Sequence, residues 1–249
     1  MGAYLSTPKK EKSTEVFENE YYRVASSGMQ GWRTGMEDAD CVHLEGKFAC
    51  LGVFDGHGGK EVALYVGRYI VKELKKNASF LRSDYMASLK ELFLGMDTLM
   101  LTEPAKRELH RLQADGEPAP GEVYSSFAGC TAVFAMIHDN VLYVANAGDS
   151  RAVLGRAGTA VDMTYDHKPD NPEEFARITK AGGTVEDGRI MGNLNLSRSL
   201  GDYEYKQNAS LPAEEQMVTA NPELKQIQLT PQDEFIILAC DGVWDVLTN

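Results

Sequence analysis

Three strongly apolar segments of this chain each end in an aspartate that is followed by a small residue. The pairs are Asp55-Gly56 after LGVF, Asp149-Ser150 after YVANAG, and Asp241-Gly242 after FIILAC. Any one of these pairs is also a common way to end a strand in a turn. Three such ends favour a shared site, because strands of one core converge and clustered carboxylates repel unless a cation lies between them. An all-oxygen ligand set indicates Mg²⁺, Mn²⁺ or Ca²⁺ rather than Zn²⁺.

An arginine precedes a further acidic pair in the segment GWRTGMEDAD, where Arg33 comes before Glu37 and Asp38. A guanidinium presents a planar fork that matches two phosphate oxygens. Taken alone, Arg33 is better explained by a surface ion pair with these acids. Beside a divalent-metal cluster, however, an arginine indicates phosphate chemistry.

His57 stands two residues after Asp55 in the segment DGHGG. In that position an imidazole can give a proton to a leaving alkoxide; the alternatives are a further metal ligand or a turn histidine. Carboxylates for hard metals, an arginine and a nearby acid together predict metal-assisted hydrolysis of a phosphate ester. The sequence contains neither a Cys-x5-Arg motif nor a P-loop GxxxxGK[ST], so it indicates neither a cysteine phosphatase nor a P-loop nucleotide triphosphatase.

Hydrophobic periodicity predicts the elements that position these residues. Alternation of apolar residues predicts two strands in CVHLEGKFACLGVF, joined at Glu45-Gly46. Helical spacing predicts two amphipathic helices, through residues 62–74 and 81–99, whose apolar stripes require a sheet to cover. The segment from Ala114 to Glu122 is expected to be a loop because of its Pro and Gly content.

The second half of the chain is predicted to consist mostly of strands. TAVFAMI and VLYVANA flank a turn at residues 138–140, and with AVLGR they indicate an antiparallel meander. A short helix is expected between Asn171 and Gly183, with Asn171 as N-cap, Pro172 first in the helix and Glu174 completing a capping box. ELKQIQL and FIILACDG add two more strands. Strands, then two helices, then more strands indicate the α+β class with mostly antiparallel sheets.

Composition is typical of an ordinary globular protein with one good-sized domain. The chain has 249 residues, of which 43% are hydrophobic and 25% charged. Its 25 Lys and Arg against 37 Asp and Glu give a net charge of −12, which argues against nucleic-acid binding. Its apolar runs are far shorter than the roughly 20 residues of a transmembrane helix. The four cysteines form no regular framework, so we expect reduced thiols and a cytoplasmic protein.

The N-terminal sequence MGAYLS fits the pattern for N-myristoylation on Gly2, and Lys9, Lys10 and Lys12 follow closely. One acyl chain with three lysines would give weak, reversible membrane attachment. The alternative is an unmodified N-terminus. We expect residues 1–20 to be a polar leader that precedes the main domain.

The order of motifs along the chain resembles that of the metal-dependent type 2C serine/threonine protein phosphatases. The resemblance runs from about Ser26 to Leu247 and rests on GMQGWRTGMEDAD, VFDGHGG, GCTAV, NAGDSR, DHKPDNPEE, RITKAGGTV, LSRSLGD and FIILACDGVWDVL. It implies a β-sandwich of two mostly antiparallel sheets flanked by helices. It also implies phosphorylated protein substrates and a centre of two Mg²⁺ or Mn²⁺ ions, with a third in some members.

The resemblance implies a role for each acidic residue. By the family's pattern Asp55 bridges both metals, Glu37 and the carbonyl of Gly56 complete one site, and Asp241 belongs to the other. Asp149 and Asp241 match the positions that hold the third ion. In the implied mechanism, water bridging the metals attacks phosphorus directly and no phosphoenzyme forms.

The remaining site residues are implied in the same way. Arg33 matches the phosphate-binding arginine and His57 the general acid. Asp38 and Thr131 match positions that order metal-bound water. The stretch 167–213 corresponds to the flap beside the active site, which the family uses to discriminate substrates.

One departure from the family concerns the end of the chain. Members continue past ACDGxWD to an Asp-Asn motif that supplies another metal ligand, whereas the Asp-Asn pairs here, at residues 139–140 and 170–171, occur too early. We therefore expect 21–249 to be a catalytic domain that is C-terminally incomplete. The alternative function is a weakly active or inactive pseudophosphatase that serves as a scaffold module.

Overall fold

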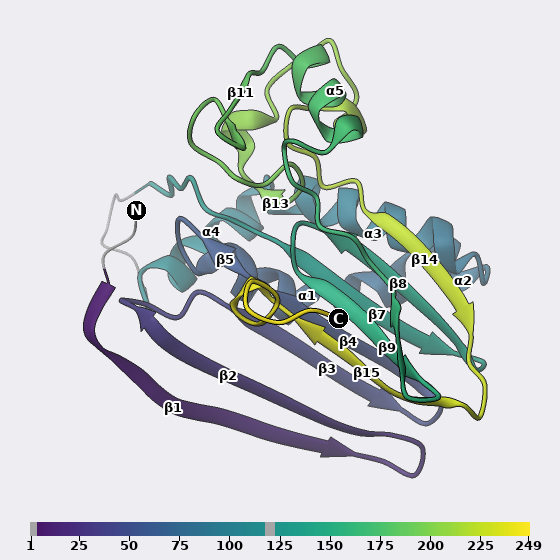
Figure 1. The fold of residues 1–249 in the computed structure, drawn as a ribbon. Helices are drawn as coiled ribbons and strands as arrows, with labels where there is room; N and C mark the ends of the chain where they lie inside the picture. Colours follow the sequence, from purple (N-terminus) through teal and green to yellow (C-terminus); the bar gives the residue numbers. More distant parts are fainter. Residues whose placement is uncertain (1–3, 118–122) are drawn as a thin grey trace.

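Two stacked antiparallel sheets form the centre of the computed structural model, which describes residues 4–117 and 123–249 (Figure 1). The larger sheet has the order β14-β8-β7-β4-β3, and all of its neighbouring strands are antiparallel. Its strands are β3 (Ala39–Glu45), β4 (Phe48–Phe54), β7 (Ala132–His138), β8 (Val141–Ala147) and β14 (Glu223–Gln228). The predicted α+β class with antiparallel sheets is confirmed.

Both faces of this sheet are buried, as the alternation along β7 shows. Phe134 and Met136 face the helices, whereas Val133, Ala135 and Ile137 face the second sheet. A strand covered on both sides is expected to be apolar at nearly every position. The sequence of β7, AVFAMIH, has this composition.

The second sheet has the order β10-β9-β15 and stacks on the first through a core that includes Val144, Leu154 and Leu238. Its strands are β9 (Arg151–Arg156), β10 (Thr159–Asp162) and β15 (Asp233–Ala239). The predicted meander is therefore wrong in one respect. β7 and β8 do form a hairpin, but β9 crosses to the second sheet and pairs with β10 and β15. The Gly148-Asp149-Ser150 connection redirects the chain there, with Gly148 at a φ of 131°.

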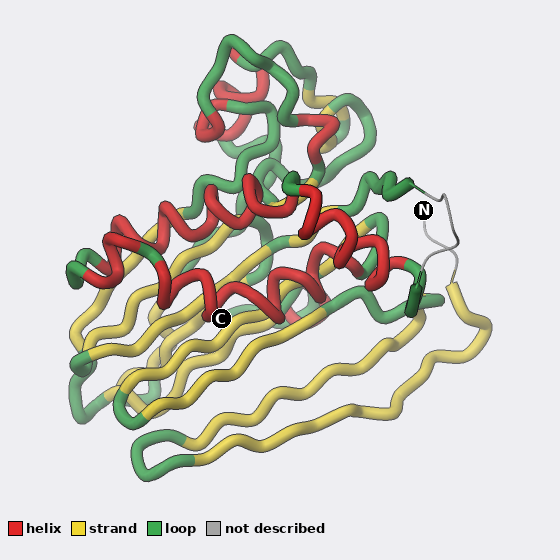
Figure 2. The backbone as a smooth tube through the Cα atoms, turned by 180° about the vertical axis from the view of Figure 1, so that it is seen from behind, coloured by secondary structure: helices red, strands yellow, loops and turns green. Residues whose placement is uncertain are grey.

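Helices cover the outer face of the larger sheet (Figure 2). They are α1 (Glu61–Lys76), α2 (Ala78–Leu81), α3 (Tyr85–Met100) and α4 (Glu103–Gln113). The first predicted helix is confirmed as α1. The second begins later than predicted, because the side chain of Asp84 caps α3 by accepting from the N–H of Ala87 at 3.2 Å. The sequence analysis gave no sign of α4.

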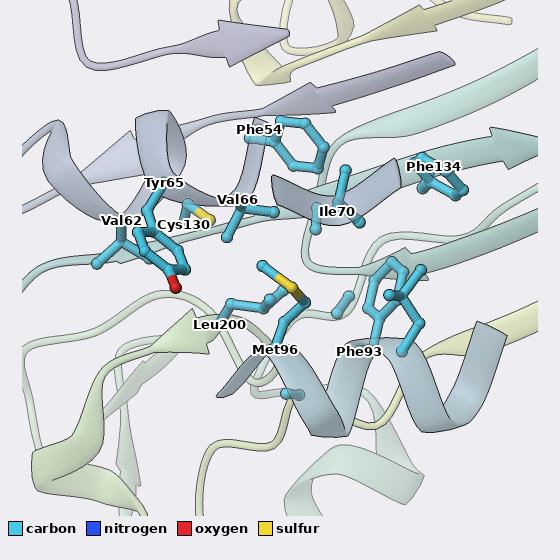
Figure 3. Close-up of a cluster of buried hydrophobic side chains, with 14 of the residues drawn as sticks. Phe54, Val62, Tyr65, Val66, Ile70, Phe93, Met96, Cys130, Phe134 and Leu200 are labelled. Carbon is cyan, nitrogen blue, oxygen red and sulfur yellow. The ribbon is translucent and has the colours of Figure 1, made fainter. Parts of the chain in front are cut away.

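The main core lies between these helices and the sheet (Figure 3). Val66 and Ile70 of α1 and Phe93 and Met96 of α3 pack with Phe54 at the end of β4, all at 1% exposure or less. Burial of this many large side chains stabilises the fold by about 1.5–3 kcal/mol for each. The core thus fixes the end of β4, where Asp55 follows.

The polar N-terminal stretch is part of the fold rather than a separate leader. β1 (Tyr4–Glu18) pairs antiparallel with β2 (Arg23–Arg33), and a groove separates β2 from β15. Lys9, Lys10 and Lys12 are exposed on β1. Gly2, the predicted acylation site, lies outside the described residues.

A small unit with its own core of Ile178, Ile190 and Val218 rises beside the sheets (Figure 1). It covers most of the stretch 167–213 expected to be the flap and extends beyond it to Val218. It contains α5 (Pro172–Lys180), β11 (Val185–Glu186) and β12 (Arg189–Ile190). The predicted capping box is wrong. The side chain of Asn171 makes no capping bond, and Glu174 is buried between Arg177 and Arg198 instead.

Short elements complete the chain: β5 (Gly56–His57), β6 (Gly129–Cys130), β13 (Leu200–Gly201), two 3-10 turns (Tyr203–Tyr205 and Ala213–Glu215) and α6 (Asp241–Trp244). The predicted loop at 114–122 has no helix or strand through residue 117, and 118–122 lie outside the described residues. All four cysteines are free. Within 4–117 and 123–249, the helices are too short or too polar to cross a membrane.

Candidate metal centre and phosphate site

The three predicted strand ends meet at one end of the sandwich. β4 and β8 are both antiparallel to β7, so they run in the same direction and end together, with Asp55 and Asp149 just beyond. Asp241 follows β15 from the second sheet and begins α6. The convergence expected from the sequence is therefore present in space.

The carboxylates are close enough to oppose one another's ionisation. Burial, then the negative charges of Asp38, Asp241 and Asp149, raise the pKa of Asp55 to about 9. Burial also raises the pKa of Asp38 and of Asp149. Such a cluster is costly as four bare anions, and a divalent cation between the oxygens removes that cost. The donor set therefore fits a metal centre.

Asp38 lies closer to this centre than its predicted supporting role required. The pairing of Ala39 with Phe54 in the β3–β4 register places Asp38 beside Asp55. Ligand atoms of Asp38, Asp55 and Cys240 all lie within 4.8 Å of one another. Burial raises the pKa of the Cys240 thiol far above its ordinary value, so the sulfur stays protonated and the effective donors are oxygens.

Gly56 is a position that only glycine can fill. A Cβ atom there would lie 2.3 Å from the backbone oxygen of Glu37, so the two backbones are in direct contact. This contact brings Glu37, which is half-buried, to the edge of the cluster. The structure thus brings together the two residues that the sequence assigned to one metal.

Thr131 connects two of the acidic strand ends. Its backbone N–H donates to the carbonyl of Asp55 at 2.9 Å, and its hydroxyl shares a hydrogen bond of 2.8 Å with that of Ser150. Gly148 packs against Thr131, since a Cβ there would approach the Thr131 Cβ to 2.5 Å. Thr131 thereby fixes the spacing between Asp55 and Asp149.

Asp149 has a basic partner that the sequence analysis did not assign. The ammonium of Lys168 donates to Asp149 Oδ2 from the start of the flap region. Asp149 is buried, whereas Lys168 keeps about a third of its side chain exposed, at 36%. The lysine neutralises part of the acidic cluster.

Arg33 and His57 border the cluster on the solvent side. Arg33 is exposed at the end of β2, and its positive charge acts on Asp38. Burial by itself lowers the pKa of His57, but the carboxylate of Asp202, with Asp149 and Glu37, more than offsets this and raises it. A raised pKa favours the form of the imidazole that can give a proton, and an exposed guanidinium can bind phosphoryl oxygens, so both groups suit a phosphate ester.

All nine residues predicted for the site thus lie at or beside one end of the sandwich. The residue most clearly missed is Asp202, which contacts His57. A weaker signal existed in the pair Gly201-Asp202, which has the same residue types as Gly148-Asp149, although the residues before it are not uniformly apolar. Lys168 had no comparable signal, because a lysine in a polar segment is ordinarily a solvated surface residue.

A two-sheet sandwich with buried carboxylates for hard cations at its strand ends places the protein among metal-dependent hydrolases. A family model described as "Protein phosphatase 2C" matches residues 22–249, and the chain belongs to this family. "Protein phosphatase 2C 1" of Paramecium tetraurelia is 50% identical over 252 residues, which cover 100% of this chain and 82% of the relative. "Probable protein phosphatase 2C 21" of Arabidopsis thaliana is 42% identical, covering 100% of this chain and 79% of the relative.

Solved structures share the fold. A phosphatase from a pathogenic strain of Toxoplasma gondii superposes with a TM-score of 0.68 at 25% identity, covering 97% of this chain and 79% of that one. A Caenorhabditis elegans sex determining protein gives a TM-score of 0.64 at 25% identity, covering 96% of this chain and 53% of that one. The expected β-sandwich flanked by helices is confirmed.

Proposed function

We propose that this protein is a phosphatase that removes phosphate from phosphoserine and phosphothreonine in proteins, using Mg²⁺ or Mn²⁺. The observation that carries the proposal is the convergence of Asp38, Asp55, Asp149 and Asp241 beside an exposed arginine. Membership of the family and the names of its relatives support the same function.

The metal ions would be held by the carboxylates of Asp55, Asp149 and Asp241, with Glu37 and the carbonyl of Gly56 on one side. When bound, divalent ions supply charge stabilisation to the phosphoryl group and lower the pKa of coordinated water. Burial and then the negative charges of Asp38, Asp241 and Asp149 oppose ionisation of Asp55, and a bound cation would offset both effects.

The protein's own side chains would divide the remaining work. The guanidinium of Arg33 binds two phosphoryl oxygens and orients the ester for in-line attack. His57 gives a proton to the leaving oxygen of serine or threonine as its bond to phosphorus breaks. Asp38 accepts a hydrogen bond from the attacking water, and Thr131 holds Asp55 in place. The products are the free hydroxyl of serine or threonine and inorganic phosphate.

The direct test is phosphate release from a phosphothreonine peptide with Mn²⁺, with and without EDTA. We expect activity that EDTA abolishes, and an Asp55→Asn variant at least about 100-fold slower, because charge stabilisation is worth several kcal/mol. Asp40→Asn is the matched control, because Asp40 lies two residues after Asp38, is exposed on β3 and should leave the rate unchanged when changed.

An inert wild type that is folded and binds Mn²⁺ would refute the phosphatase proposal. That result would instead support the pseudophosphatase alternative, which none of the observations above favours. A phosphotyrosine peptide of the same sequence tests the substrate class, and equal turnover of both peptides would contradict the proposed preference.

We also propose reversible membrane association through an acyl chain on Gly2 and the exposed lysines of β1. Lys9, Lys10 and Lys12 support this by lying free of the core on one strand. The test is co-sedimentation of N-myristoylated protein with vesicles containing phosphatidylserine. Binding should weaken in a variant with all three lysines changed to glutamine, and unchanged binding would contradict the role of the lysines.

A further inference from the structure

The imidazole of His57 lies against a buried carboxylate from a distant part of the chain. His57 Nε2 is 2.8 Å from Oδ2 of Asp202, and only 3% of the Asp202 side chain is exposed. The other ring nitrogen, Nδ1, makes no hydrogen bond to any described residue. Among the described residues, the ring is therefore held by a hydrogen bond at Nε2 and by none at Nδ1.

Three short strands create this contact. In the sheet β13-β6-β5, Gly129 of the central strand pairs with His57 on one side and with Gly201 on the other. Asp202 directly follows Gly201 and so lies near His57. A Cβ atom on Gly129 would lie 2.3 Å from Asp202 Oδ2 and 2.7 Å from His57 Nε2. The absence of a side chain at Gly129 is what lets the two groups meet above it.

Asp202 is itself held firmly. Its Oδ2 accepts from the hydroxyl of Ser199 at 2.5 Å, and its backbone N–H donates to the carbonyl of Ala128 at 3.2 Å. The turn before it is tied to α3, because Asp97 accepts from the N–H of Gly201 at 2.8 Å and from Lys206 at 2.7 Å. Asp202 adopts the left-handed conformation, with φ 48° and ψ 42°. These contacts fix the direction of the carboxylate toward the ring.

We propose that Asp202 is a positioning residue that holds His57 with hydrogen on Nε2 and leaves Nδ1 as the nitrogen that serves the substrate. A carboxylate accepts but does not donate, so the neutral ring is locked as the Nε2–H tautomer. This inference rests on the proposed function and deepens it.

The reaction step then has a defined proton path. Water adds to phosphorus, the bond between phosphorus and the leaving oxygen breaks, and that oxygen takes the proton from Nδ1 of the imidazolium. His57 is left neutral, with Nε2–H still donated to Asp202, and the proton lost by the water later restores the imidazolium. Without Asp202 the ring can turn or change tautomer, and the proton is no longer presented.

The kinetic test compares two substrates that differ in their need for an acid. For Asp202→Asn we expect kcat on a phosphothreonine peptide to fall about 10- to 100-fold with KM unchanged, since general acids typically contribute 10²–10⁴-fold. With p-nitrophenyl phosphate, whose leaving group departs without a proton, kcat should change by less than about 3-fold. A merely structural role would lower both rates equally, and that outcome would overturn the proposal.

A double-mutant comparison tests whether Asp202 acts through His57. His57→Ala and His57→Ala/Asp202→Asn should hydrolyse the phosphopeptide at the same rate, because residues that act as a unit are not additive. Fully additive losses would contradict the proposal. Should Asp202→Asn fail to fold, Ser199→Ala removes one anchor of the carboxylate and is expected to slow only the phosphopeptide, by about 3- to 10-fold.

A spectroscopic readout keeps this inference separate from the proposed function. The NMR signal of His57 in protein labelled with ¹⁵N-histidine is identified by its loss in His57→Ala. This signal should show a protonated Nε2 in the wild type and should change in Asp202→Asn. If the wild type is inert but the tautomer depends on Asp202, the phosphatase proposal fails and the contact stands. A His57 signal that does not respond to Asp202→Asn would overturn the positioning role.

Discussion

Arg33 lies at the end of β2, where it is exposed and forms no ion pair with any residue of 4–117 or 123–249, while its charge still acts on the half-buried Asp38. A structural arginine would be expected to be engaged by a carboxylate, as Arg151 is by Asp166 at 2.5 Å. The available guanidinium is instead suited to a ligand that arrives from solvent. At the scale of single residues, the exposed position of Arg33 is typical of a group that binds a ligand rather than of a surface ion pair.

An Arg33→Ala variant should therefore bind phosphopeptide weakly while holding metal normally. We expect KM to rise about 10- to 100-fold, which corresponds to the roughly 1.5–3 kcal/mol of a charged hydrogen bond. Steady-state kinetics and a Mn²⁺ titration measure the two properties. Arg23→Ala, an exposed change at the start of the same strand, is the control. Loss of Mn²⁺ affinity with unchanged KM would remove the phosphate-binding role.

At the scale of elements, the flap region depends on buried charge rather than on a large apolar core. Its core contains three fully buried residues, Ile178, Ile190 and Val218. Glu174 of α5 accepts hydrogen bonds of 2.6 Å from each of Arg177, Arg198 and Ser197. Although burial opposes ionisation of Glu174, these partners lower its pKa to about 2. The charged network ties α5 to the segment that leads to β13.

Glu174→Gln should weaken the flap at neutral pH. Removing one partner of a buried charge network costs about 3–5 kcal/mol, because the two arginines are left unpaired. The measurement is hydrogen exchange of the α5 amides. Glu173→Gln is the control, because Glu173 is next to Glu174 in α5 but has an exposed side chain. Equal protection of α5 in the wild type and Glu174→Gln would contradict the network's role.

The lowered pKa of Glu174 implies that the stability of the flap depends on pH. Its folded pKa, about 2, lies below its ordinary value of 4.5, so the stabilisation is complete above about pH 5. It is lost as the pH falls from there toward 2, because the unfolded chain takes up the proton first. The difference in α5 protection between the wild type and Glu174→Gln should therefore shrink over that range, and a constant difference would contradict the assignment.

At the scale of the whole molecule, the candidate metal centre draws its carboxylates from both sheets. Asp55 and Asp149 follow strands of the larger sheet, whereas Asp241 follows β15 of the smaller one. A cation held between them would cross-link the sandwich at one end and would remove the repulsion among its carboxylates. Metal binding and global stability should therefore be linked.

We expect Mn²⁺ at about 100 times its Kd to raise Tm by about 5–10 °C, from roughly 2.7 kcal/mol of binding free energy. Asp55→Asn should lose most of this rise, yet without metal it should be at least as stable as the wild type, because it relieves repulsion. Thermal unfolding with Mn²⁺ or EDTA measures both effects, and Asp40→Asn should behave as the wild type does. The role of Asp55 as a metal ligand would be contradicted if Asp55→Asn had a lower Tm than the wild type without metal and its Tm still rose with Mn²⁺.

The sequence by itself determined the strands that end in Asp55, Asp149 and Asp241, the first helix, and the class of chemistry. These follow from local patterns: periodicity reports burial, and aspartate after an apolar run reports a strand end. The tertiary structure alone decided that β9 leaves the meander for the second sheet, that Glu174 joins a buried network rather than a cap, and that Asp202 reaches His57. Each of these depends on pairing between segments far apart in the chain, and no local pattern of residues encodes which distant strand or carboxylate will be the partner.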